Sequence, residues 1–282
     1  MKKVTISNKE IFPIGLGTSK IGNNPETFNQ EVEAIRTGII NGVQLIDTAE
    51  MYGDGNAERL VGHAIKPFDR EDLFIVSKVL PNNASKKQIP ISLDNSLKRL
   101  QLDYIDLYLL HWKGNHPLEE TIEALETAKS TGKIKAWGVS NLDITDMKKL
   151  VTLPNGTYCA TNQVRYNIAD RGIEFDLVPM MKEYQIPIMA YAPLSRGDQL
   201  GAQLTKQQVL IEISKKYDAD VYQILLAWCI RNGETIAIPR SGKSQHVLNN
   251  VKAAYIELSK EDLKKIDAIY PPPTKSEPLA LW

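Results

Sequence analysis

Four polar side chains end short apolar runs of the sequence or follow one closely: Asp47, Tyr52, Lys78 and His111. The first and third are 31 residues apart, and the third and fourth are 33 apart. Each separation fits one strand followed by one helix, so three successive parallel strands would bring these side chains to the same edge. Tyr52 lies in the loop just beyond Asp47 and is close enough to join them.

An acid, a lysine, a tyrosine and a histidine at one edge suit general-acid chemistry. Tyrosine donates a proton poorly at its usual pKa of about 10, but a neighbouring ammonium group stabilises the phenolate and lowers that pKa. Asp47 would keep Lys78 charged and oriented, and His111 would hydrogen-bond a substrate oxygen. The set therefore predicts protonation of a carbonyl oxygen while hydride reaches its carbon, with Tyr52 as the acid.

Each of these residues also has a simpler interpretation. Asp47 and Lys78 could be a structural ion pair inside a scaffold, and His111 beside Trp112 could be a core histidine. A metal site made of Asp47, Glu50 and His111 is disfavoured because the lysine would oppose a cation, so we expect no metal. The shared position at strand ends favours catalysis over these alternatives.

Eight apolar runs would form the strands that position these side chains. They are 13–18, 44–48, 73–79, 104–111, 134–140, 159–166, 186–193 and 235–241. Their apolar residues are continuous, as in strands covered on both faces, and helical periodicity separates them, as at Leu93, Leu97 and Leu100. We therefore predict one α/β domain over 1–282, a (β/α)8 TIM barrel with an N-terminal extension and a short C-terminal tail.

Helix boundaries can also be predicted. Thr205 and Ser259 each precede an amide or acid side chain by three residues, the pattern of a helix start. Gly42, Gly132 and Gly233 fall where helices should stop.

Composition excludes several classes of partner. The 34 Lys and Arg residues balance 34 Asp and Glu residues, which leaves no surplus charge for nucleic acid or an anionic membrane. No apolar stretch approaches the roughly 20 residues of a membrane span, and polar residues interrupt any leader after Met1. Cys159 and Cys229 are isolated, without a metal-like spacing. We expect a cytoplasmic protein, with a monomer as the default state.

The chemical residues belong to a wider pattern that resembles the aldo-keto reductases. Segments that match this family in order and spacing are 15–18, 42–53, 110–112, 138–141, 162–163, 190–194 and 238–241. The resemblance implies a reductase of aldehydes and ketones, with Asp47, Tyr52, Lys78 and His111 as its catalytic tetrad. It is similar to small bacterial members that reduce methylglyoxal and related dicarbonyls, so the expected partner is a small carbonyl substrate.

The same resemblance implies a bound nicotinamide cofactor. Its ring would stack on Tyr191, and its carboxamide would be held by the side chains of Ser140, Asn141 and Gln163. The loop from Arg240 offers two cations, a hydroxyl and backbone N–H groups, which suit a 2′-phosphate and hence NADPH or NADP+ rather than NADH. Without the resemblance, these cations could simply be solvated. The complete predicted cofactor set is Ser140, Asn141, Gln163, Tyr191, Ala192, Leu194, Arg240, Ser241, Gly242, Lys243, His246, Asn249 and Asn250.

Three positions depart from the family pattern. His246 stands where an arginine often covers the adenine, and Asn249 stands where a glutamate often precedes Asn250. An imidazole is mostly neutral at pH 7, so these departures leave NADH possible although NADPH is favoured. Ser19 stands where many members of the family have a bulky aromatic residue, which predicts an open substrate pocket bordered by Trp112.

We expect that pocket to be shallow and to accept small carbonyl compounds broadly. A chain of this length leaves little beyond the barrel for insertions, and the segments 114–116 and 195–204 are brief. The tail at 278–282, with Trp282, is a candidate pocket wall.

Two other functions remain open. The chain could bind the cofactor as a regulatory or redox-sensing subunit with little turnover. Alternatively, a barrel lyase could form a Schiff base at Lys78, although a neighbouring Asp47 would keep that lysine charged.

Overall fold

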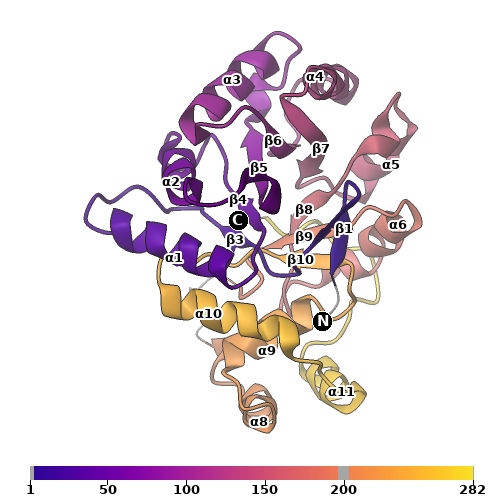
Figure 1. Ribbon diagram of the computed structural model, residues 1–282. Helices are drawn as coiled ribbons and strands as arrows, with labels where there is room; N and C mark the ends of the chain where they lie inside the picture. The colour runs from indigo at the N-terminus through magenta and orange to yellow at the C-terminus, as the bar shows by residue number, and fades with distance from the viewer. Residues whose placement is uncertain (1–2, 196–202, 282) are drawn as a thin grey trace.

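A closed ring of parallel strands forms the centre of the molecule (Figure 1). The structure is a computed structural model that describes residues 3–195 and 203–281. The sheet order is β10-β9-β8-β7-β6-β5-β4-β3, and parallel bridges Ile14–Ala237 and Gly17–Arg240 join its two edges. The strands are β3 (Leu16–Gly17), β4 (Leu45–Asp47), β5 (Phe74–Val79), β6 (Ile105–Leu110), β7 (Ile134–Ser140), β8 (Asn162–Arg165), β9 (Ile188–Tyr191) and β10 (Thr235–Ala237).

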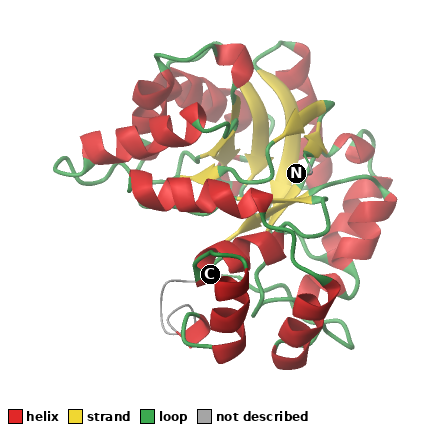
Figure 2. Ribbon diagram, turned by 60° about the horizontal axis from the view of Figure 1, so that its bottom comes forward, coloured by secondary structure: helices red, strands yellow, loops and turns green. Residues whose placement is uncertain are grey.

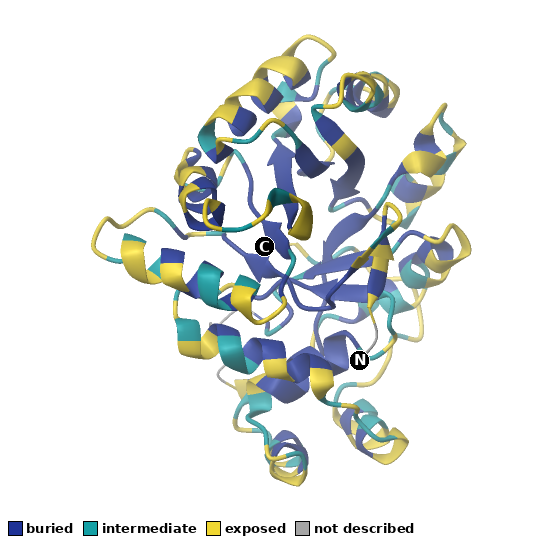
Figure 3. Cartoon of the chain, in the orientation of Figure 1, coloured by how far each residue is buried: buried dark blue, intermediate teal, exposed yellow. Residues whose placement is uncertain are grey.

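Helices surround this ring on its outer side (Figure 2). They are α1 (Phe28–Ile40), α2 (Asn56–Ile65), α3 (Gln88–Leu100), α4 (Leu118–Ser130), α5 (Ile144–Thr152), α6 (Leu177–Glu183), α8 (Gln208–Lys216), α9 (Val221–Cys229), α10 (Ser244–Lys252) and α11 (Lys260–Ile269). The strands are buried while the helices expose their outer faces (Figure 3). The predicted (β/α)8 barrel is thereby confirmed, and the continuous apolar runs reflect burial of each strand on both faces.

The apolar core has two layers. Side chains such as Val76, Leu107 and Met189 point into the barrel, and each is completely buried. A larger layer between sheet and helices includes Trp137 and Trp228. Alternation of successive strand residues between the two layers explains why no polar face interrupts the runs.

An N-terminal hairpin closes the end of the barrel at which the strands begin. It pairs β1 (Val4–Ile6) with β2 (Lys9–Ile11), and the turn residues Ser7 and Asn8 have φ angles of 47° and 66°. Val4, Ile6 and Ile11 pack with the interior layer of the barrel. This segment was predicted only as an extension, since its turn residues Ser7 and Asn8 are not the Asn-Gly or Asp-Gly pair that marks a two-residue hairpin.

Two helix starts were predicted, at Thr205 and at Ser259, and the structure confirms the second. The Ser259 side chain accepts a hydrogen bond from the Asp262 N–H and begins α11. The prediction at Thr205 is wrong, since α8 begins at Gln208. The N–H groups of residues 206 and 207 instead bond back to the carbonyls of residues 203 and 204, so these residues close a preceding turn.

The most apolar helix of the outer layer, α9, is short. α9 has nine residues and begins with a capping box between Asp220 and Gln223. Among the described residues, no helix combines the length and the apolar character that a membrane crossing requires.

Candidate active site

Lys78 joins Asp47 and Tyr52 at the end of the barrel where the strands finish. Its Nζ atom lies 2.8 Å from Asp47 Oδ2, 3.1 Å from the Tyr52 hydroxyl and 2.9 Å from the Thr48 carbonyl oxygen. The Lys78 side chain is 0% exposed and that of Asp47 is 3% exposed. All three ammonium protons therefore have acceptors in a site removed from water.

Strand register explains how these residues meet. Asp47 pairs with Val76 and Lys78 pairs with Leu109, so the ends of β4, β5 and β6 lie side by side. His111 follows β6, and its N–H donates to the Val79 carbonyl at 3.0 Å. The His111 and Tyr52 rings meet edge to face, with centroids 5.7 Å apart. The structure thus brings all four predicted tetrad residues together.

Burial and charge act in opposite directions on Lys78. Burial alone lowers the pKa of Lys78, but the Asp47 carboxylate and the Tyr52 hydroxyl together raise that pKa above its usual 10.5. The lysine is therefore protonated at neutral pH, in a position to stabilise negative charge on the tyrosine oxygen.

The pKa of Tyr52 differs from the expectation. Burial raises the pKa of Tyr52 above its usual 10.0, and the opposing effect of Lys78 does not overcome it. Lys78 acts on this pKa in the predicted direction, but the net shift is opposite to the prediction because the effect of burial is larger. Tyr52 is consequently in the protonated form that a general acid requires.

His111 is a neutral imidazole. Burial lowers its pKa to about 2, and the positive charge of Lys78 acts in the same direction. The ring also contacts Trp112, with centroids 4.9 Å apart. A neutral imidazole can still donate one N–H, so His111 can hydrogen-bond a carbonyl oxygen without carrying charge to it.

The residues predicted to hold the nicotinamide form a second cluster, in which Gln163 of β8 pairs in register with Ser140 at the end of β7. The Tyr191 hydroxyl donates to Asn141 Oδ1 at 2.9 Å, and Asn141 Nδ2 donates to Ser140 Oγ at 3.0 Å. Ser140 Oγ donates in turn to the Gln163 carbonyl oxygen at 2.8 Å. Asn141 has a φ angle of 58°, a left-handed conformation that asparagine tolerates better than most residues.

Gln163 connects this cluster to the tetrad. Its Nε2 atom donates to Asp47 Oδ1 at 2.7 Å, while Lys78 occupies the other carboxylate oxygen. Both partners can only donate at these atoms, so both Asp47 oxygens accept, as in an ionised carboxylate. Residue types and spacing do not indicate this contact, because the two residues come from strands far apart in the chain.

The predicted phosphate loop lies between β10 and α10. Arg240 and Lys243 are exposed, and the Lys243 N–H donates to Ser241 Oγ at 3.1 Å. No side chain caps the start of α10, so its first N–H groups remain able to bind an anion. The Gly242 carbonyl accepts from Gln30 Nε2 at 2.9 Å, which ties the loop to α1. Two cations, a hydroxyl and a helix start fit the phosphate that was predicted here.

The remaining predicted cofactor residues belong to α10 and to the segment after β9. Asn249 Nδ2 donates to Asp220 Oδ2 at 3.1 Å, so this amide faces the start of α9. His246 is exposed on α10 and Asn250 is buried, while Ala192 and Leu194 are half-buried beyond β9. Their roles toward a cofactor stay predictions.

Glu50 does not face the tetrad as a ligand would. Its Oε1 atom accepts from the Leu80 N–H at 2.7 Å and from Asn83 Nδ2 at 3.0 Å. These contacts give Glu50 a role in the loop after β5, which argues against the metal site of Asp47, Glu50 and His111.

The structure describes some of the residues that were predicted to form the walls of the substrate pocket. Ser19 and Trp112 are half-buried, and the next residue, Lys113, forms an ion pair with Asp146 of α5. Tail residues 276–279 line a cavity of about 410 Å³ together with 143–145, 173, 176 and 177, which includes no tetrad residue. Trp282 and residues 196–202 of the predicted brief loop lie outside the described residues. The shallow substrate pocket stays a prediction.

Comparison with known proteins agrees with this geometry. The model of the Aldo/keto reductase family matches residues 13–271. Methylglyoxal reductase YeaE of Escherichia coli (strain K12) is 45% identical over 96% of this chain and 96% of its own length. Glyoxal reductase of Bacillus subtilis (strain 168) is 36% identical over 90% of this chain and 87% of its own length. An aldo/keto reductase from Klebsiella pneumoniae, crystallised in complex with NADP and acetate, has a TM-score of 0.97 at 44% identity and covers 100% of this chain and 99% of that one. The chain belongs to the aldo-keto reductase family.

Proposed function

We propose that this protein is an NADPH-dependent reductase that converts small aldehydes, ketones and dicarbonyls such as methylglyoxal to alcohols, with Tyr52 as the general acid. The observation that supports this proposal most directly is the buried Lys78 ammonium, which lies 2.8 Å from Asp47 and 3.1 Å from the Tyr52 hydroxyl. Relatives named methylglyoxal reductase and glyoxal reductase support the substrate class. The Klebsiella structure in complex with NADP supports the cofactor.

The chain has groups suited to both ends of the cofactor. Tyr191, Ser140 and Asn141 would hold the nicotinamide end, and Arg240 with Lys243 would hold the phosphate end. Bound NADPH supplies the hydride.

The protein's own residues handle the proton. Tyr52 gives its hydroxyl proton to the carbonyl oxygen, and Lys78 stabilises the phenolate that remains. Asp47 keeps Lys78 charged and directed at the Tyr52 oxygen. His111, neutral at working pH, donates an N–H to the carbonyl oxygen and orients it.

The contacts of Lys78 argue against a Schiff-base lyase. A lysine nucleophile must lose its proton, yet the neighbours of Lys78 raise its pKa and occupy all its hydrogen-bonding positions. The regulatory alternative retains the same cofactor contacts, so turnover decides between it and catalysis.

The test compares Tyr52→Phe with the wild-type protein. We expect the wild type to consume NADPH with methylglyoxal, and the variant to lose about 10²- to 10⁴-fold in kcat while its NADPH Kd is unchanged. Tyr222→Phe, at a side chain 46% exposed on α9, is the matched control and should keep full activity. Full activity of Tyr52→Phe would overturn the assigned acid. Tight NADPH binding by a wild type that reduces no carbonyl in a panel would favour the regulatory function.

A further inference from the structure

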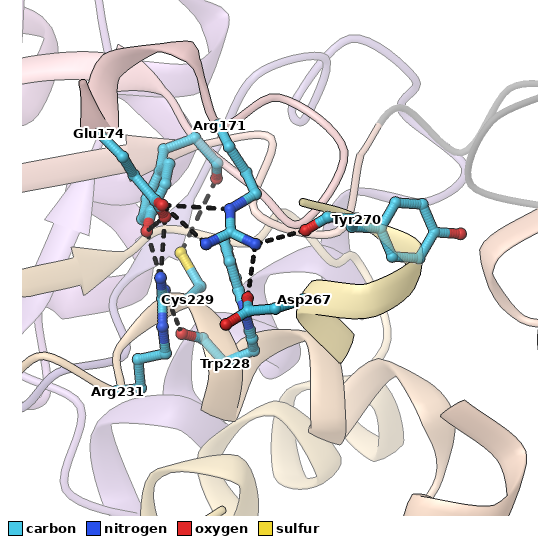
Figure 4. Close-up of polar contacts among 8 residues, drawn as sticks. Arg171, Glu174, Trp228, Cys229, Arg231, Asp267 and Tyr270 are labelled. Atoms are coloured by element: carbon cyan, nitrogen blue, oxygen red, sulfur yellow. Dashed lines mark hydrogen bonds and ion pairs between the residues drawn. The ribbon is translucent and has the colours of Figure 1, made fainter. Parts of the chain in front are cut away.

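The segment 166–174, which joins β8 to α6, is fixed on its outer side by a network of ion pairs (Figure 4). Arg171 contacts Glu174 at 2.8 Å and Asp267 of α11 at 2.7 Å. Glu174 also accepts from Arg231 at 2.8 Å, and Arg231 lies over the Trp228 ring. The Arg171 side chain is 7% exposed and that of Glu174 is 16% exposed, so their pair is largely shielded from solvent, whereas Asp267 is 43% exposed. The segment is thereby held against α9 and α11.

On its inner side the same segment presents Asn167, which is completely buried. Asn167 Oδ1 accepts from the N–H groups of Ala169 at 2.9 Å and Asp170 at 3.0 Å. Asn167 Nδ2 donates to Asp170 Oδ2 at 2.8 Å and to the Ala192 carbonyl at 3.1 Å. The acceptor side of the amide shapes its own loop, while the donor side reaches the strand that carries Tyr191.

The hydrogen bond to the Ala192 carbonyl is important because Ala192 directly follows Tyr191, the last residue of β9. Ala192 has a φ angle of 47°, a left-handed conformation that disfavours a residue with a Cβ atom. Its carbonyl also accepts from the Ser195 N–H at 3.0 Å, so two donors stabilise this turn. Tyr191 is thus fixed through its hydroxyl by Asn141 and through its adjoining peptide by Asn167.

Asp170 links this arrangement to the C-terminal tail. Asp170 Oδ2 accepts from Arg165 Nε at 2.7 Å as well as from Asn167. Arg165 also donates from its Nη1 atom to the Leu281 carbonyl at 3.2 Å. The amide of Asn167 is therefore held from both sides, with little freedom to rotate away from Ala192.

We propose that Asn167 is a positioning residue for the nicotinamide end of the cofactor, acting through Ala192 on the ring plane of Tyr191. This inference rests on the proposed function, because it requires Tyr191 to stack on the nicotinamide. Asn167 does not itself touch the reacting atoms.

The test is Asn167→Asp, which keeps the acceptor oxygen and removes both donor hydrogens. Loss of the hydrogen bond to the Ala192 carbonyl should weaken NADP+ binding about three- to tenfold, measured as a Kd by tryptophan fluorescence. Binding of 2′,5′-ADP, which lacks the nicotinamide, should be unchanged. Asn167→Ala is the second variant, free of added charge, and should show the same separation of the two ligands.

Two controls separate positioning from general damage. Asp267→Asn breaks one ion pair on the outer side of the same segment, and should lower Tm without changing either Kd. In a Tyr191→Ala background, Asn167→Ala should no longer change the NADP+ Kd, since the ring it positions is gone.

Unchanged NADP+ binding in both Asn167 variants, or equal weakening of NADP+ and 2′,5′-ADP, would overturn the proposal. Wild-type protein that fails to bind NADP+ would instead refute the proposed function, so the two failures are distinguishable.

Discussion

Replacing Asp47 with asparagine would remove the counter-charge of a completely buried lysine. The Lys78 side chain is 0% exposed, and the ion pair joins atoms 2.8 Å apart. Breaking one partner of such a pair costs about 3–5 kcal/mol because an uncompensated charge stays buried. We expect Asp47→Asn to lower the free energy of unfolding at neutral pH by about this amount.

The pH dependence of stability provides a sharper test. In the wild type the pKa of Lys78 is raised above 10.5, so its contribution is complete below that pH and is lost as pH rises through the folded-state pKa. In Asp47→Asn, burial should dominate and bring the pKa below its unfolded value. The unfolded variant then binds more protons than the folded one, and its stability should rise with pH by up to about 1.4 kcal/mol per unit.

Urea denaturation from neutral pH toward pH 9 measures both effects. The double variant Asp47→Leu with Lys78→Met should recover most of the lost stability, since a buried pair can be replaced by apolar residues at little cost. Asp54→Asn, at an exposed position of the same loop, is the matched control and should change neither stability nor its pH dependence. A loss below about 1 kcal/mol in Asp47→Asn, with the pH dependence of the wild type, would show that Asp47 does not compensate the buried charge of Lys78.

Three further predictions test other parts of the molecule. The pKa of His111, lowered to about 2, predicts that wild-type stability falls as pH drops below 6.5 and that His111→Gln weakens this fall; equal slopes in urea titrations would contradict it. Arg240→Ala with Lys243→Ala should raise the KM for NADPH about 10- to 100-fold while leaving that for NADH nearly unchanged, and an equal rise for both would exclude a 2′-phosphate contact. Ile6→Ala should cost about 2–5 kcal/mol because Ile6 is completely buried in the barrel interior, and an unchanged Tm would show that the hairpin does not stabilise the barrel.

The barrel could be predicted because each strand is a continuous apolar run between helical segments. The ends of the strands could not be predicted as closely: the run at 13–18 contains only Leu16–Gly17 as paired strand, with Ile14 in an isolated bridge. The hairpin escaped prediction because its strands have three residues each. Its stability comes from packing against the barrel, which a local pattern does not contain.

The tetrad could be predicted because parallel strands bring their last residues to one edge. The contact between Gln163 and Asp47 could not, since it crosses the barrel between strands that are not neighbours. The pKa of Tyr52 was predicted in the wrong direction for a related reason. Residue type and proximity indicate the effect of Lys78, but the competing effect of burial depends on how the folded chain surrounds the Tyr52 side chain.

Asp47 and Glu50 illustrate this limit most directly. Both are acids near the end of β4, and residue type alone would allow either of them to pair with Lys78. The backbone decides between them, because Asp47 is the last strand residue and its side chain meets Lys78, whereas Glu50 turns to the Leu80 N–H. Each acid satisfies a donor that the other cannot reach. Without this arrangement the buried ammonium would lose its carboxylate partner and the Leu80 N–H would lose its side-chain acceptor, so the fold itself determines which acid serves the candidate site.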